Sequence, residues 1–259
     1  MSSERGRRHV GVVVLGSSVS ILVRPHREPG EATYAEWLGE LLRTDTTTVA
    51  VVNEGRWFEM VDAMHTRWDS AVAPRLPDVV VLHVGFVECQ PWVLPHRIHR
   101  WALDWKTSLH PGPRLVRRLV ADRLVAVLRW WTPRATRGLR GHLSKRSPAR
   151  FAAEVERLVR QTRRELGALV LVVSISPPGS WLPELMPDIG ERVARYNRIL
   201  RAVVTEQADP GVRLVDVAPV HRALGAAAST DGIHLSGAAH HDLAVLLAAE
   251  VEDWYESLP

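Results

Sequence analysis

The feature of this chain that most constrains its fold is a series of five short apolar runs separated by segments with helical patterns. A continuous apolar run of this length is typical of a strand buried on both faces, as in a parallel sheet covered by helices on each side. The runs occupy residues 10–15, 48–52, 78–84, 168–175 and 212–217. Their alternation with helical segments predicts an α/β protein with a five-stranded parallel sheet between two layers of helices.

Helix signals fill the intervals between these runs. Ser147 precedes Pro148, a pair typical of a helix N-cap and first helical position, and Gly167 is suited to end that helix. Ser236 is an N-cap candidate for the last helix. Together with the spacing of apolar residues, these signals predict helices over residues 31–43, 58–72, 148–166, 189–207 and 237–254.

Length and composition exclude several classes of protein. A chain of 259 residues can bury a sizeable core, and 46% hydrophobic with 24% charged residues is ordinary for a globular protein. Cys89 is the single cysteine, which excludes an internal disulfide and a multi-cysteine zinc site. No apolar run reaches the roughly 18 residues of a membrane-spanning helix.

Three arginines, Arg5, Arg7 and Arg8, precede the first apolar run. A basic segment before an apolar one resembles a short signal peptide. However, the apolar run ends at Gly16, after only about six residues, and no clear small-residue cleavage site follows. The pattern therefore favours a first strand, and we expect a cytoplasmic protein.

Polar residues follow the strands where an open parallel sheet places its ligand sites, beyond the carboxyl ends. Ser18 follows the first run, and Asp231 and His234 stand three residues apart before the final helix. In a tight turn this offset lets the carboxylate bind one imidazole nitrogen and leaves the other free as a base. Together with Ser18, the pair predicts Ser-His-Asp nucleophilic catalysis.

Several blocks of sequence carry a family resemblance, which covers nearly the whole chain apart from residues 91–150. The blocks are residues 12–18, 51–55, 80–88, 196–200, 212–217 and 230–235. They resemble the SGNH/GDSL hydrolase superfamily, in which a strand leads into Gly-Asp-Ser; here Ser17 replaces the Asp and Ser18 matches the nucleophile. The resemblance implies a flavodoxin-like, three-layer α/β/α sandwich. It also implies an esterase, lipase, thioesterase, carbohydrate acetylesterase or acyltransferase.

The resemblance assigns roles to further residues. It implies oxyanion-hole donors at the backbone N–H groups of Ser18, Gly55 and Gly85. Phe58 stands where the family usually has an oxyanion-hole glycine, and Val87 where it has an oxyanion-hole asparagine; loss of one such donor lowers the rate about 10²–10³-fold. Side chains that could substitute are His83, His65 and Asn53. The residues expected in the substrate pocket are Phe58, Val87, Glu88 and Trp92.

The twelve histidines do not indicate a metal site. His96 and His99, and likewise His240 and His241, lack a convincing third ligand, and solvated helix faces account for both pairs. Cys89 follows the third strand without a partner that would activate it, which favours a packed thiol. We expect no metal and no cofactor.

Residues 91–150 differ in composition from the rest of the chain. They hold 14 Lys and Arg against 2 Asp and Glu, with 5 of the 10 tryptophans, whereas the remaining residues hold 19 basic and 27 acidic residues. We interpret residues 1–259 as a single domain with a basic helical insert as a candidate lid. Alternatives are an interfacial helix on an anionic membrane surface and docking of an anionic partner such as coenzyme A or an acidic carrier protein. We expect no nucleic-acid partner, because no known binding motif is present.

Together these residues predict a serine hydrolase that cleaves a carboxylic ester or thioester of a small-molecule or lipid-like acyl substrate. Ser18 attacks the acyl carbonyl, His234 is the base, and Asp231 orients His234. An acyltransferase that uses a coenzyme A, carrier-protein or ester donor is one alternative. A catalytically degenerate binding protein of the same fold is the other, favoured by Phe58 and Val87.

Overall fold

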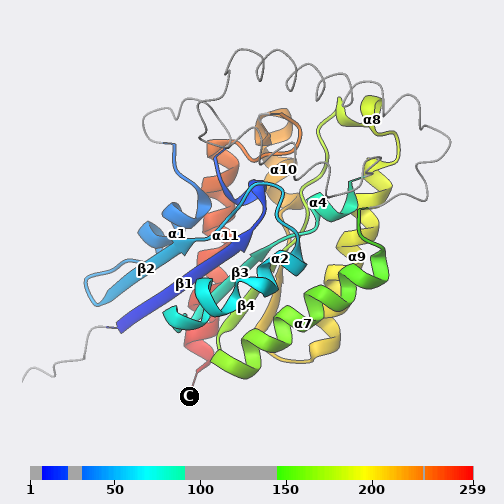
Figure 1. Ribbon diagram of the computed structural model, residues 1–259. Coiled ribbons are helices and arrows are strands. Elements are labelled where there is room, and N and C mark those ends of the chain that lie inside the picture. The colour runs from blue at the N-terminus through cyan, green and yellow to red at the C-terminus, as the bar shows by residue number, and fades with distance from the viewer. Residues whose placement is uncertain (1–7, 23–30, 91–144, 230, 259) are drawn as a thin grey trace, which may run out of the picture.

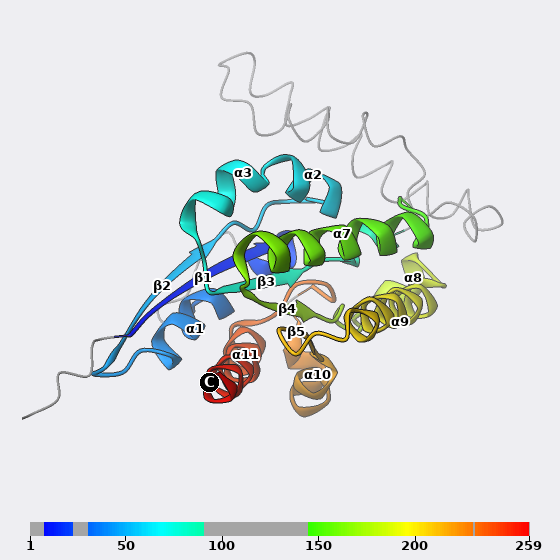
Figure 2. The same cartoon turned by 90° about the horizontal axis from the view of Figure 1, so that it is seen from below.

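The computed structural model describes residues 8–22, 31–90, 145–229 and 231–258 (Figure 1). Most of the predicted insert, including Trp92, His96 and His99, lies outside the described residues. Figure 2 shows a central sheet with helices on both faces, which is the predicted α/β/α architecture.

Five parallel strands form one sheet in the order β2-β1-β3-β4-β5 (Figure 2). The strands are β1 (Arg8–Gly16), β2 (Thr47–Asn53), β3 (Val79–His83), β4 (Leu169–Val173) and β5 (Val212–Val215). β1 lies between β2 and β3, and Val12 is in register with Val51 on one side and Val79 on the other. Because all strands are parallel, the loops that follow their carboxyl ends gather at one edge of the sheet.

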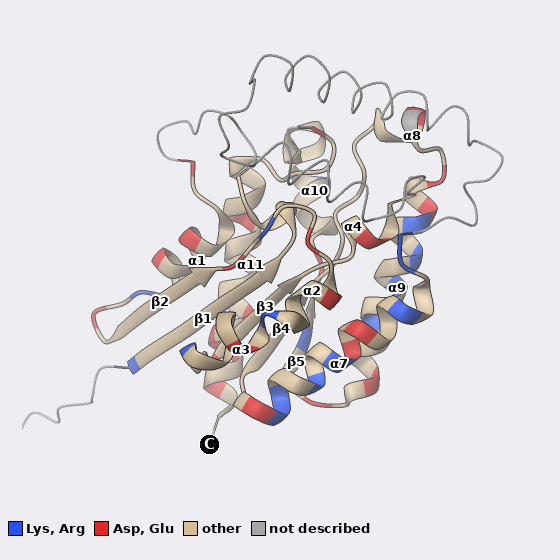
Figure 3. Cartoon of the chain, in the orientation of Figure 1, with Lys and Arg blue, Asp and Glu red and all other residues tan. Residues whose placement is uncertain are grey.

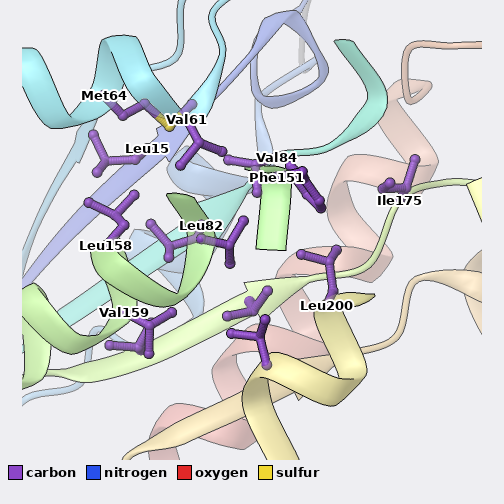
Figure 4. Packing of buried hydrophobic residues seen from close by; sticks show 14 of the residues in the cluster. Leu15, Val61, Met64, Leu82, Val84, Phe151, Leu158, Val159, Ile175 and Leu200 are labelled. Carbon is purple, nitrogen blue, oxygen red and sulfur yellow. The ribbon is translucent and has the colours of Figure 1, made fainter. Parts of the chain in front are cut away.

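Two hydrophobic clusters hold the helices against the two faces of the sheet. Along β1, Val13 and Leu15 belong to one cluster, whereas Val12 and Val14 belong to the other. The first cluster, shown in part in Figure 4, packs against helices α2 (Val61–Thr66), α3 (Trp68–Ala71), α7 (Pro148–Leu166) and α9 (Ile189–Gln207). The second packs against α1 (Tyr34–Leu41), α10 (Ala218–Leu224) and α11 (Gly237–Ser257). The alternation of strand side chains explains why both faces of the sheet are apolar.

The helices α7 and α9 have the bounds that the sequence predicts. The hydroxyl of Ser147 accepts a hydrogen bond from the Arg150 N–H, and Gly167 ends α7 in the left-handed conformation at φ 65°. Figure 3 shows basic and acidic residues interspersed along α7, where Arg150 pairs with Glu154 at 2.8 Å. Local capping signals therefore determine where this helix starts and stops.

The segment predicted as one helix over residues 58–72 is two short helices, α2 and α3. Phe58 has φ 53°, in the left-handed region, which a right-handed helix cannot include. Arg67, with φ −106° and ψ 10°, separates the two helices. The regularly spaced apolar residues nevertheless face the core, because Met64 and Trp68 are both buried in the first cluster.

Several short elements lie outside the sequence prediction, because they are too short to show a period. They are α4 (Phe86–Cys89), α8 (Leu182–Leu185), α10 and the 3₁₀ turns Ser18–Ser20, Ala73–Arg75 and Gly225–Ala228. None of the helices in the described part of the chain has the length and apolarity needed to cross a membrane.

Candidate active site

A tight turn after β1 places Ser18 at the carboxyl edge of the sheet. A β-carbon at Gly16 would lie only 2.6 Å from the Ser20 hydroxyl, so the turn requires a glycine there. The Ser20 hydroxyl donates to the Ser17 carbonyl at 2.9 Å. Ser18 is the first residue of the 3₁₀ turn, where the turn itself offers no acceptor for the Ser18 N–H.

His234 lies between Ser18 and Asp231. Its Nδ1 is 2.7 Å from Asp231 Oδ2, and its Nε2 is 2.9 Å from Ser18 Oγ. Because a carboxylate can only accept, Nδ1 carries the proton and the lone pair of Nε2 faces the Ser18 hydroxyl. The three residues chosen from the sequence are therefore brought together in the order that proton transfer from Ser18 requires.

Hydrogen bonds between side chains and the backbone fix the turn that carries Asp231 and His234. Asp231 Oδ1 accepts hydrogen bonds from the N–H of Ile233 at 3.1 Å and of His234 at 2.8 Å, and Gly232 has φ 73°. The Ser229 hydroxyl donates to the His234 carbonyl at 2.8 Å. Burial opposes ionisation of Asp231, but the hydrogen bonds and charge of His234 outweigh it and lower the Asp231 pKa to about 2. The carboxylate is thus ionised at neutral pH.

Two of the three backbone donors expected in the oxyanion hole are already bonded within the protein. The Gly55 N–H donates to Asn53 Oδ1 at 2.9 Å, and the Gly85 N–H donates to Glu88 Oε2 at 3.1 Å. Both groups are therefore engaged in holding their own loops, which leaves Ser18 as the backbone donor of the predicted set.

The three side chains considered as substitutes are also bonded to protein groups. Asn53 Nδ2 donates to the Ser20 carbonyl at 2.8 Å, and the His65 Nε2 lies 3.0 Å from the Glu154 carbonyl. His83 is buried with its Nδ1 3.3 Å from the Tyr34 hydroxyl, and burial lowers the His83 pKa to about 3. These contacts give the three side chains structural partners in place of an oxyanion.

An ion-pair cluster that the sequence analysis missed holds the loop after β2. The buried guanidinium of Arg67 donates to both carboxylate oxygens of Glu59, at 2.7 and 2.5 Å. It also donates to the carboxylate and the carbonyl of Glu54, at 3.0 and 2.6 Å. Arg75 binds the other carboxylate oxygen of Glu54 at 2.8 Å. Ion pairs between residues 8 to 21 positions apart have no sequence period, so no spacing signal could have revealed this cluster.

The same loop after β2 carries Trp57, another residue missed by the sequence analysis. The centroid of the Trp57 indole lies 5.9 Å from that of the His234 imidazole, and the planes are 64° apart. Phe58, expected in the substrate pocket, is half-buried with its ring 6.0 Å from that of Trp57. The one signal in the sequence was its place next to Phe58, which was expected in the substrate pocket.

The other described residues expected in the pocket, Val87 and Glu88, are buried on α4. Glu88 accepts hydrogen bonds from the N–H groups of Val61 at 3.0 Å and Gly85 at 3.1 Å, so its carboxylate joins the start of α2 to the start of α4. Burial raises the Glu88 pKa to about 7, against the lowering effect of these hydrogen bonds and of the Lys145 charge. In the structure Glu88 is thus an internal bridge between helices.

The expectation that His240 and His241 lie on a solvated helix face is wrong for His240. His240 is buried, because it lies on the face of α11 that packs against α1, and its ring stacks on that of Tyr34 at 5.6 Å. Burial lowers the His240 pKa to about 4.

Cys89 is buried, as predicted, and its thiol donates to the Phe86 carbonyl. Among the described residues, no group of three or more His, Cys, Asp or Glu is placed to hold a metal ion.

Comparison with known structures identifies the fold. An acetylxylan esterase from Geobacillus stearothermophilus, Axe2, matches with a TM-score of 0.59 and 17% identity, over 93% of this chain and 94% of that chain. LAE5, an α/β hydrolase enzyme from the metagenome of Lake Arreo, Spain, matches with a TM-score of 0.60 and 18% identity, over 94% and 95%. The acetyl xylan esterase AlAXEase matches with a TM-score of 0.57 and 16% identity, over 96% and 100%. At these identities the likeness shows the fold.

Comparison of the sequence identifies the family. No curated protein matches this chain. The family model of the GDSL-like lipase/acylhydrolase family matches residues 14–241, from the end of β1 into α11, and so includes Ser18, Asp231 and His234. The chain therefore belongs to the GDSL-like lipase/acylhydrolase family and is an ester-bond hydrolase.

Proposed function

We propose that this protein hydrolyses a carboxylic ester or thioester through a covalent acyl-enzyme on Ser18. The observation that carries the proposal is the pair of contacts made by His234, 2.9 Å to Ser18 Oγ and 2.7 Å to Asp231 Oδ2. Both distances lie within the reach that proton transfer requires.

The chemistry follows from these contacts. Ser18 Oγ attacks the acyl carbon while its proton passes to His234 Nε2, and the Ser18 N–H donates to the developing oxyanion. His234 then gives the proton to the leaving alcohol or thiol as the bond to the acyl carbon breaks. Water attacks the acyl-enzyme in the second half-reaction, transfers a proton to His234, and releases the acid with Ser18 restored. The ionised Asp231 stabilises the imidazolium in both halves.

Hydrolysis is favoured over acyl transfer because the family whose model matches this chain is one of lipases and acylhydrolases. A Trp-lined lid that excluded water would favour the acyltransferase alternative, and most of the candidate lid lies outside the described residues. Product analysis with and without added alcohols or amines separates the two reactions. Because two structural neighbours are named as acetylxylan esterases, acetate esters are the first substrates to test.

The decisive experiment combines labelling and kinetics. A fluorophosphonate probe is expected to label the wild-type chain at Ser18, as located by peptide mass spectrometry. Ser18→Ala and His234→Ala are each expected to lower kcat for p-nitrophenyl acetate by about 10⁴-fold or more, and the double variant by no more than the single ones. Retention of the wild-type rate by Ser18→Ala would show that another residue is the nucleophile.

A further inference from the structure

Trp57 is one of the few large apolar side chains that the described part of the protein leaves exposed. The exposed set is Leu41, Trp57, Leu76, Trp181, Val245 and Leu258. Trp57 is 53% exposed although part of its indole lies against His234. Beside a reactive group, an exposed indole offers a broad apolar face that a bound ligand can cover.

The backbone holds Trp57 in place before any ligand arrives. The preceding residue, Arg56, donates its N–H to the Gly16 carbonyl at 3.0 Å, which ties the loop to the end of β1. On either side of Trp57, Glu54 and Glu59 are both bound by the buried Arg67. A side chain presented by a loop fixed at both ends loses little conformational freedom when a ligand binds, so more of the contact free energy appears as affinity.

The contact with His234 indicates which part of the ester meets Trp57. In the proposed mechanism His234 Nε2 protonates the leaving oxygen, so the alcohol part must lie beside the imidazole during acylation. The acyl carbon and its oxyanion lie instead at Ser18 Oγ and the Ser18 N–H. A side chain packed against His234 is therefore placed to contact the alcohol part of the substrate.

We propose that Trp57 is a specificity-determining residue that favours esters whose alcohol carries a six-membered ring. Such a ring presents a broad apolar face to the indole, which a short linear alcohol does not. The inference rests on the proposed function, since it uses the role of His234 in protonating the leaving group. It adds the class of alcohol that the site prefers.

The test uses one ring placed on either side of the ester bond. Cyclohexyl acetate carries the ring on the alcohol part, and ethyl cyclohexanecarboxylate carries it on the acyl part. The readout is the ratio of kcat/KM for the two esters, which reports acylation. Trp57→Ala is expected to lower this ratio about tenfold relative to the wild type, whereas Trp57→Phe, which keeps a flat ring, retains most of it. Val245→Ala, which removes exposed apolar surface from α11, is expected to keep the wild-type ratio.

Each other outcome has a definite meaning. An unchanged ratio in Trp57→Ala would overturn the inference, and an equal loss of kcat/KM with both esters would assign Trp57 to the positioning of His234 instead. That result would leave the proposed function intact, provided that Ser18→Ala is inactive on both esters. Full activity of Ser18→Ala would overturn the proposed function and this inference with it.

Discussion

Gly179 and Gly232 are in backbone contact, although they belong to different loops. The Gly179 N–H donates to the Gly232 carbonyl at 2.8 Å, and a β-carbon on Gly179 would lie only 2.4 Å from the Gly232 α-carbon. Gly232 lies within the turn that carries Asp231 and His234. The loop after β4 therefore supports the position of the proposed catalytic base.

This contact predicts that Gly179→Ala displaces the turn. The new methyl group overlaps backbone atoms, so we expect a loss of about 1–3 kcal/mol in the free energy of unfolding. We also expect kcat/KM to fall by up to about 10²-fold, since a displacement on the order of 1 Å at His234 is enough for that. Steady-state kinetics and denaturant titration measure the two effects. Gly190→Ala is the matched control, because a β-carbon at Gly190 meets no atom within 4 Å; equal effects of the two substitutions would contradict the prediction.

The low pKa of Asp231 predicts that the protein loses part of its free energy of unfolding at acid pH. The ordinary pKa is 3.8 and the folded-state pKa is about 2, so ionised Asp231 stabilises the folded state above pH 3.8. This stabilisation is lost as the pH falls toward 2. The measurement is the difference in free energy of unfolding between the wild type and Asp231→Asn as a function of pH. A difference that stayed constant from pH 5 to pH 2 would be incompatible with the His234–Asp231 contact.

The raised pKa of Glu88 predicts that the free energy of unfolding depends on pH with the sign opposite to that for Asp231. Burial raises its pKa from 4.5 to about 7, so the folded state binds a proton more tightly than the unfolded state does. The wild type is therefore expected to lose stability relative to Glu88→Gln as the pH rises from about 4.5 to about 7. Unfolding free energies of both proteins across this range give the answer. The same difference at pH 4.5 and pH 7 would show that the carboxyl group ionises normally.

Arg67 predicts a large effect of a conservative change. Arg67→Lys keeps the positive charge but removes the fork that binds the buried Glu59 through two oxygens, and it removes hydrogen bonds to the half-buried Glu54. We expect a loss of about 1.5–3 kcal/mol in the free energy of unfolding, the range for lost hydrogen bonds to charged groups. The control is Arg43→Lys, because Arg43 pairs with Glu40 at an exposed site and we expect a change within about 1 kcal/mol there. Thermal or denaturant unfolding measures the free energy of unfolding of the two variants. Similar losses in both would show that the Arg67 ion pairs stabilise the fold no more than an exposed pair does.

Much of the fold follows from local signals in the sequence. A strand buried on both faces needs a continuous apolar run, and the five runs are the five strands of the sheet. The bounds of α7 follow from Ser147, Pro148 and Gly167, whose effects act within one helical turn. The prediction over residues 58–72 was wrong about the path of the chain, because apolar spacing carries no information about the left-handed backbone of Phe58.

For the site, the sequence by itself determined which residues we propose as the catalytic ones. Ser18 stands at the end of a strand, and Asp231 and His234 share one tight turn, so residue type and short-range spacing were enough to select them. Only the tertiary structure decided what surrounds them. It assigned the N–H groups of Gly55 and Gly85 to internal acceptors and placed Trp57 against His234. The reason is physical. Trp57 and His234 belong to loops far apart in the sequence, which meet only when the chain folds. The acceptors of the Gly55 and Gly85 N–H groups are only two and three residues away, but the Asn53 and Glu88 side chains are free to turn toward other partners until the loops are packed.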